Sequence, residues 1–128
     1  MKPEMCLVWS VALAVVQMLV AVTGAFNQVG LMRLVGNREG MPEITGWGGR
    51  AERAHLNMLR NLVLFASLVL VAMATGKVNE TVVLGAQIFF WARVAYAAIY
   101  VAGIIWLRTL AWLVSIIGLV MIFAQLVK

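Results

Sequence analysis

The sequence predicts an all-α integral membrane protein, a single-domain bundle of four transmembrane helices over residues 1–128. Two observations support this prediction. Hydrophobic residues make up 64% of the chain and charged residues 12%, whereas soluble domains hold roughly 45 to 50% apolar residues. Four apolar stretches, at about residues 5–30, 54–75, 81–105 and 109–127, each approach or exceed the ~20 residues that cross a bilayer. An ordinary soluble domain is therefore excluded.

Three connections join these helices. Residues 31–53 form one long loop, whose glycines are typical of irregular backbone outside the bilayer. A tight polar turn at residues 76–80 joins the second and third helices. The apolar tract from Val82 to Val127 is too long for one crossing at about 1.5 Å per residue, so it must fold back. We expect that turn near Trp106, Leu107 and Arg108, where an amphipathic ring and a cation suit the membrane interface.

Basic residues are unevenly shared between the two ends of the bundle. The long-loop end carries Arg33, Arg38, Arg50, Arg53 and Arg108, and the other end carries Lys2, Lys77 and Lys128. The positive-inside rule then places the long loop in the cytoplasm and both termini outside it. The net charge of +5 is dispersed, so we expect membrane lipids and no nucleic acid as partners. The single cysteine and the single histidine lack further ligands at helical spacing, so no metal site is expected.

Polar side chains continue into the second predicted helix. Arg53, Asn57 and Arg60 recur at i, i+4 and i+7, which places them along one helix face. Because an arginine near the bilayer centre costs on the order of 2.5 kcal/mol or more, this face should meet protein, water or a bound anion. Counted from the turn near Lys77, Arg60 and Arg93 lie at about one depth, where no helix supplies a carboxylate. Either an exogenous anion offsets them, or Arg60 snorkels to the cytoplasm and Arg93 bonds to carbonyls or tyrosines.

The third predicted helix adds a second polar stripe. Arg93, Tyr96 and Tyr100 fall at i, i+3 and i+7, and such donors can hold an anion or stabilise a thiolate. In the first helix, Gln28 is a candidate ligand contact near the cytoplasmic mouth. We interpret Gln17 as a helix-packing residue.

Three segments together resemble the MAPEG family, the membrane-associated proteins in eicosanoid and glutathione metabolism. They are RAERAHLNMLRNLVLF from Arg50, ARVAYAAIY from Ala92 and RTLAW from Arg108. The match covers the chain from about Arg53 onward, while the first helix and the loop match in layout. The resemblance implies a homotrimer in a bacterial inner membrane, with glutathione between neighbouring subunits and a lipophilic electrophile entering from the lipid.

On the family template, most of the polar residues already singled out acquire roles. The resemblance implies that Arg108 is catalytic, because it helps to activate the thiol. The implied glutathione contacts, together with the further candidates, are Arg53, Asn57, Arg60, Arg93, Tyr96, Tyr100, Arg33 and Gln28. Arg60 departs from the family, which usually has a glutamate there, and an arginine would repel the ammonium group of glutathione.

Two functions therefore remain open. One is a glutathione-dependent transferase or peroxidase acting on lipophilic electrophiles. The other is a non-catalytic protein of the same fold, which binds a lipid or acidic ligand or serves as an accessory subunit of a larger membrane complex. A small multidrug exporter is disfavoured, because those proteins depend on a glutamate in helix one and none lies between Met5 and Gly30.

Overall fold

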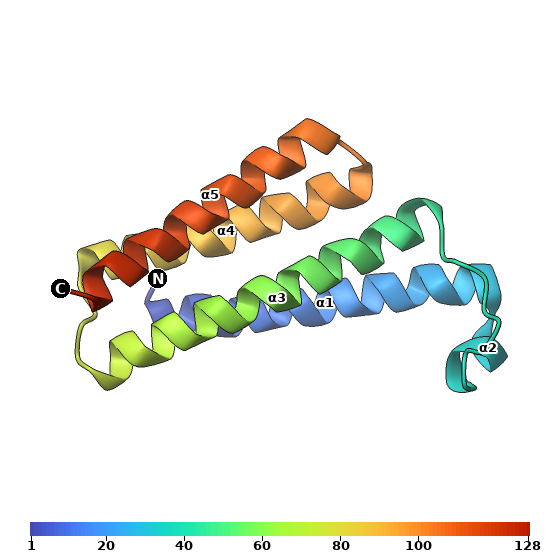
Figure 1. The fold of residues 1–128 in the computed structure, drawn as a ribbon, viewed down its shortest axis with the longest axis horizontal. Coiled ribbons are helices and arrows are strands. Elements are labelled where there is room, and N and C mark those ends of the chain that lie inside the picture. Colours follow the sequence, from blue (N-terminus) through green and yellow to red (C-terminus); the bar gives the residue numbers. More distant parts are fainter.

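The computed structural model describes residues 1–128 and consists of helices and their connections (Figure 1). The four long helices are α1 (Pro3–Val29), α3 (Gly46–Ala74), α4 (Glu80–Ala102) and α5 (Ile105–Leu126), and the short helix α2 (Leu31–Val35) lies in the long loop. Each long helix is long and apolar enough to cross a membrane. The prediction of a multi-pass, all-helical membrane protein is confirmed.

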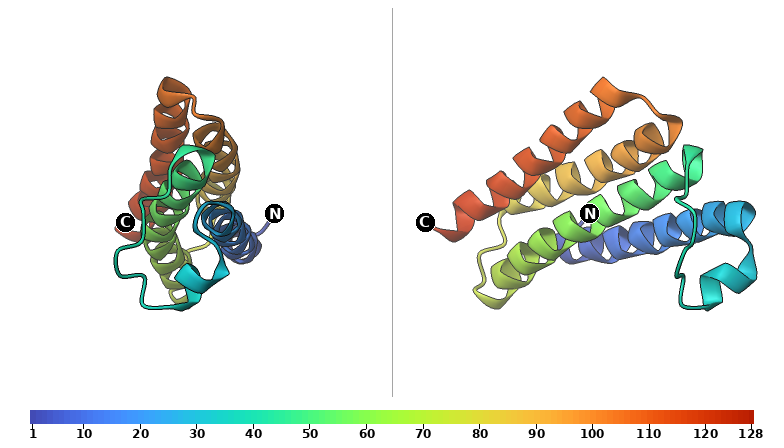
Figure 2. Two further views of the ribbon diagram at one scale, coloured as in Figure 1. Left: turned by 90° about the vertical axis from the view of Figure 1, so that its right-hand side faces the viewer. Right: turned by 45° about the vertical axis from the view of Figure 1, so that its right-hand side comes forward.

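The long helices form two antiparallel hairpins. Helix α1 packs chiefly against α3, and α4 packs chiefly against α5. Both termini lie at the same end as the α3–α4 turn, and the long loop lies at the opposite end with the α4–α5 turn (Figure 1). In the turned view of Figure 2, α3 and α4 approach each other at the loop end, where Arg50 and Arg53 of α3 donate hydrogen bonds to Val101 and Tyr100 of α4. This half of the bundle contains Arg53 and Asn57 of α3, Arg93, Tyr96 and Tyr100 of α4, and Arg108 of α5.

Glycine pairs allow the helices within each hairpin to touch. A Cβ atom on Gly24 of α1 would lie 2.6 Å from the Cα atom of Gly48 in α3. In the other hairpin, a Cβ atom on Gly118 would lie 2.6 Å from the carbonyl oxygen of Gly85. Small residues at such crossings let backbones approach closely, which is how helices associate in lipid.

Helix α3 starts at Gly46 rather than at Ala54, so the loop predicted over residues 31–53 is shorter. Three of the glycines that indicated a loop, Gly46, Gly48 and Gly49, in fact form the start of this helix. Gly48 and Gly49 are buried there, because a residue without a side chain can pack directly against α1 and the loop. Helix α2 takes up a further part of the predicted loop.

The turn between the last two helices lies at Gly103 and Ile104 rather than at Trp106 to Arg108. Gly103 has φ +85°, a left-handed conformation that glycine adopts without steric cost, and it ends α4. Its amide N–H donates to the carbonyl of Ile99 at 3.1 Å. As a result, Arg108 belongs to the first turns of α5 and is held by a helix.

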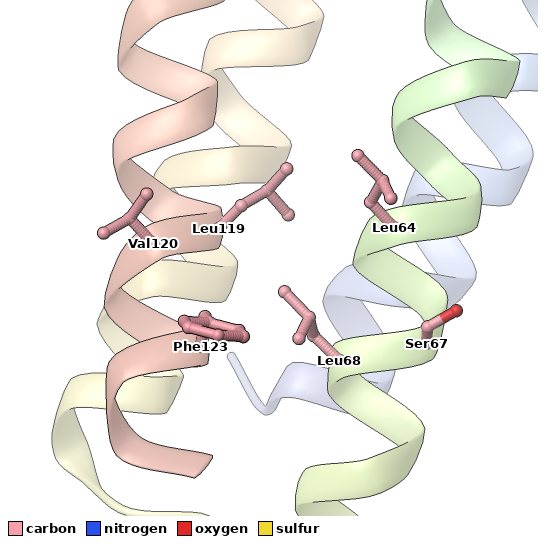
Figure 3. A pocket seen from close by; sticks show the side chains of 6 residues that line it. All are labelled: Leu64, Ser67, Leu68, Leu119, Val120 and Phe123. Carbon is pink, nitrogen blue, oxygen red and sulfur yellow. The ribbon is translucent and has the colours of Figure 1, made fainter. Parts of the chain in front are cut away.

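An apolar groove lies between α3 and α5, in the half of the bundle nearer the two termini. Its volume is about 300 Å³, and its lining consists of Leu64, Ser67, Leu68, Leu119, Val120 and Phe123 (Figure 3). The Ser67 hydroxyl donates to the carbonyl of Val63 in its own helix at 2.7 Å, so it offers the groove little polarity. This surface suits lipid tails or other apolar groups.

Candidate functional site

Asn57 is the hydrogen-bonding centre of the polar cluster. Its side-chain oxygen accepts from Nη2 of Arg93 at 2.8 Å and from Nδ2 of Asn61 at 3.1 Å. Asn61 also donates to the backbone carbonyl of Asn57 at 2.8 Å. The amide of Asn57 is thereby fixed on α3 with its oxygen directed at the guanidinium of α4.

Arg93 is buried but only partly hydrogen-bonded. The side chain is 1% exposed, and its Nε and Nη1 atoms have no hydrogen-bond partner. Its guanidinium carbon lies 4.2 Å from the centre of the Tyr96 ring, which gives a cation–π contact. A buried polar group without a partner costs about 1–3 kcal/mol, and a charged one costs more. The fold therefore holds a cation whose remaining donors require an acceptor.

Tyr100 lies between two further arginines. The Nε atom of Arg53 donates to the Tyr100 hydroxyl at 3.3 Å, and the guanidinium of Arg108 lies 4.4 Å from the centre of the Tyr100 ring. The rings of Tyr96 and Tyr100 meet edge to face, with centroids 5.5 Å apart. These contacts join α3, α4 and α5 at one level. We call Arg53, Asn57, Arg93, Tyr96, Tyr100 and Arg108 the arginine cluster.

A small polar pocket opens beside this cluster. Its volume is about 190 Å³, and its lining consists of Asn57, Tyr96, Arg108, Thr109 and Trp112. No acidic residue lines it. Carboxylates and other anions bind guanidinium groups through charge-assisted hydrogen bonds, so the pocket can hold an anionic group.

Three predicted contacts lie outside the arginine cluster. Arg60 is exposed on α3. Arg33 donates to the carbonyl of Gly40 at 3.2 Å within the loop. Gln28 exchanges two hydrogen bonds with the backbone of Thr45, at 2.7 and 2.9 Å, and so fixes the loop where it enters α3. The sequence predicted that Arg93 and Arg60 lie at about the same depth in the membrane. In the structure Arg93 instead bonds to Asn57, which is about one helical turn farther than Arg60 from the α3–α4 connection.

Sequence reasoning missed several residues at the site. Thr109 and Trp112 belong to the pocket, and a helical reading of α5 that placed Arg108 and Trp112 at i and i+4 would have found the second. Arg50 was also missed. Its Nε donates to the carbonyl of Val101 at 2.9 Å, near the C-terminal end of α4. A cation at this end of a helix interacts favourably with the helix dipole.

Comparison with known proteins identifies the pattern. The model of the MAPEG family matches residues 6–128, essentially the whole chain. The resemblance predicted from the second, third and fourth transmembrane helices is confirmed, and the match extends it to α1 and the loop. No curated protein and no solved structure matches the chain.

Proposed function

The chain belongs to the MAPEG family, and from this membership we propose that it is a glutathione-dependent transferase or peroxidase acting on lipophilic electrophiles. One observation carries the proposal. Arg93 is 1% exposed and keeps two nitrogen atoms without a partner, and it contacts Asn57 and Tyr96, which line a pocket that contains no acid. A fold that tolerates such a cation is suited to an anionic ligand, and glutathione has two carboxylates.

The residues of the arginine cluster fit most of this ligand. The Nε and Nη1 atoms of Arg93 have no partner, and each offers an N–H group for a charge-assisted hydrogen bond to an anion. Arg53 and Tyr100 supply further donors. Arg108 is on the pocket wall, where a cation favours the thiolate form of a nearby thiol. Glutathione supplies that thiol, whose thiolate is the nucleophile.

We further propose that the site is completed by a second subunit of a homotrimer. The pocket of about 190 Å³ is smaller than the roughly 300 to 1,000 Å³ of ordinary small-molecule sites, and a tripeptide needs more room. An adjacent copy could supply the missing wall and a path from the lipid for the electrophile. We propose a bacterial inner membrane as its location, and the positive-inside rule favours an orientation with the loop end in the cytoplasm. A membrane-impermeant maleimide should then reach Glu39→Cys from the cytoplasmic side alone; labelling from the outside would contradict this orientation.

Conjugation of glutathione to a chloronitroarene tests the catalytic proposal. The purified protein should form the thioether and release chloride. Arg108→Gln should lower kcat about 100-fold, the usual effect of removing one group that stabilises a developing anion. Arg38→Gln removes an equal charge from the exposed loop and should have no effect. The absence of conjugation, or equal rates in both variants, would contradict the proposal.

The second candidate is a non-catalytic protein of the same fold that binds an acidic ligand or a lipid, alone or within a larger membrane complex. Arg60 favours it, since an arginine occupies the place of the usual family glutamate, and no carboxylate is available in the pocket for an ammonium group. Arg60→Glu separates the two candidates. If conjugation appears only in this variant, the natural chain is a binding protein; if the natural chain is already active and the variant is no faster, the enzyme reading stands.

A further inference from the structure

Two polar side chains outside the arginine cluster contain buried atoms that have no hydrogen-bond partner. Gln17 of α1 is 7% exposed, and neither Oε1 nor Nε2 of its amide has a hydrogen-bond partner. Nδ1 of His55 in α3 is likewise buried and unpartnered. Buried polar groups are nearly always hydrogen-bonded, so each exception calls for an explanation.

The packing of α1 against α3 brings these two residues to the same level. Gly24 meets Gly48 where the helices touch. Gln17 lies seven residues before Gly24, and His55 lies seven residues after Gly48. Seven residues are about two helical turns, so each residue lies on the same face as its glycine. Because the helices are antiparallel, Gln17 and His55 face the same layer of the bundle.

Gln17 also lines an apolar groove between α1, α3 and α4. The groove has a volume of about 280 Å³, and its lining includes Leu13, Val16, Gln17, Ala54, Ala97 and Val101. It contains no charged residue and shares no lining residue with the pocket of the arginine cluster. The unpartnered amide is thus the one strongly polar side chain of an intramembrane groove.

We propose that this groove binds a lipid-soluble alcohol whose hydroxyl group bonds to Gln17. A hydroxyl can donate to Oε1 and accept from Nε2 through one oxygen atom, so it satisfies both atoms of the amide in the least space. The amide atoms are closed off by neighbouring groups in the unliganded structure, so the proposal includes a rotation of the side chain toward the groove when the ligand binds. His55 does not line the groove, so Gln17 alone supplies the polar contact.

The chemistry of the groove selects against other headgroups. An ionised headgroup would find no opposite charge there, and buried charges without partners are costly. A carboxylic acid has an ordinary pKa of about 4.3 and would be ionised at neutral pH. A volume of about 280 Å³ is just below the range of ordinary ligand sites, which suits one alkyl chain or ring system rather than a two-chain phospholipid.

Photolabelling of the full-length protein in lipid nanodiscs tests the proposal. The probes are a long-chain alcohol, an alkane and a carboxylic acid of equal length, each with a diazirine, and the labelled residues are located by mass spectrometry. The alcohol should label the groove residues most strongly. Gln17→Leu should lower this labelling about five- to tenfold, the effect of losing one or two neutral hydrogen bonds. Ala97→Leu fills the groove and should lower labelling while the amide stays in place.

Ser67→Ala is the matched control, since it removes a self-satisfied hydroxyl from the groove between α3 and α5, and it should leave labelling unchanged. Equal labelling by the alkane, stronger labelling by the acid, or no effect of Gln17→Leu would overturn the proposal. So would a loss of subunit assembly in Gln17→Leu, because the amide would then bond to another copy. Glutathione binding should be unchanged in Gln17→Leu, so this proposal and the catalytic one can fail separately.

Discussion

Arg93 joins two properties that rarely occur together, deep burial and missing hydrogen-bond partners. Stability alone does not favour such a residue, because buried ionic groups are often less stable than apolar residues of similar volume. Functional sites are where proteins tolerate this kind of local cost. At the scale of single residues, the binding proposal therefore predicts opposite effects on stability and on binding.

Replacing Arg93 with methionine should make the protein more stable. The change removes a buried charge and fills most of its space, and comparable replacements stabilise by about 1–4 kcal/mol. Thermal unfolding in detergent should show a higher Tm for Arg93→Met and an unchanged Tm for Arg38→Met, which alters an exposed loop arginine. A lower Tm for Arg93→Met would mean that the fold itself compensates the charge.

Several site residues could be predicted from spacing, and one could not be placed correctly. Arg53 and Asn57 on α3, and Arg93 and Tyr100 on α4, were singled out by helical periodicity, and the structure joins them pairwise. Arg53 and Arg60 share this periodicity and are both exposed, but of the two only Arg53 bonds to α4, through Tyr100. Periodicity predicts the helix face on which a residue lies only to within about a quarter turn. Which part of that face contacts α4 depends on how the two helices cross, and a single sequence does not reveal this crossing.

At the scale of helices, composition predicted the number of membrane-spanning segments correctly but misplaced two boundaries. Gly48 and Gly49 looked like loop residues, yet they are buried in the first turn of α3. Glycine serves both as a turn residue and as a contact residue in membrane helices, and only the neighbouring helix distinguishes the two uses. Gly103 was the true turn signal, because its left-handed conformation ends α4.

The α4–α5 hairpin should depend on the contact between Gly85 and Gly118. A Cβ atom on Gly118 would lie 2.6 Å from the carbonyl oxygen of Gly85 and 2.9 Å from the amide nitrogen of Phe89, both backbone atoms that cannot turn aside. Gly118→Ala should therefore destabilise the protein by about 1–3 kcal/mol, measured as a lower Tm. Ala124→Val enlarges an exposed residue of the same helix and should change Tm little. Equal Tm values would show that the helices are farther apart.

At the scale of the whole molecule, the long helices leave broad apolar surfaces, including the groove between α3 and α5 in Figure 3. In a membrane these surfaces meet lipid or another copy of the chain. Because the pocket of the arginine cluster is small, we expect another copy of the chain, rather than lipid, to cover at least one of these surfaces. Native mass spectrometry from mild detergent should show three copies; a monomer that still binds glutathione would contradict the need for a neighbouring subunit.

Calorimetric titration of glutathione into the purified protein tests the central claim, that the arginine cluster holds an anion of this class. We expect binding with a Kd of about 1 mM or tighter, equivalent to at least about 4 kcal/mol. Asn57→Asp places a carboxylate at the atom that lies 2.8 Å from Arg93, so it should neutralise the cation and weaken binding at least tenfold. Arg38→Gln should bind normally. No binding to the natural chain, or equal binding to Asn57→Asp, would contradict the claim.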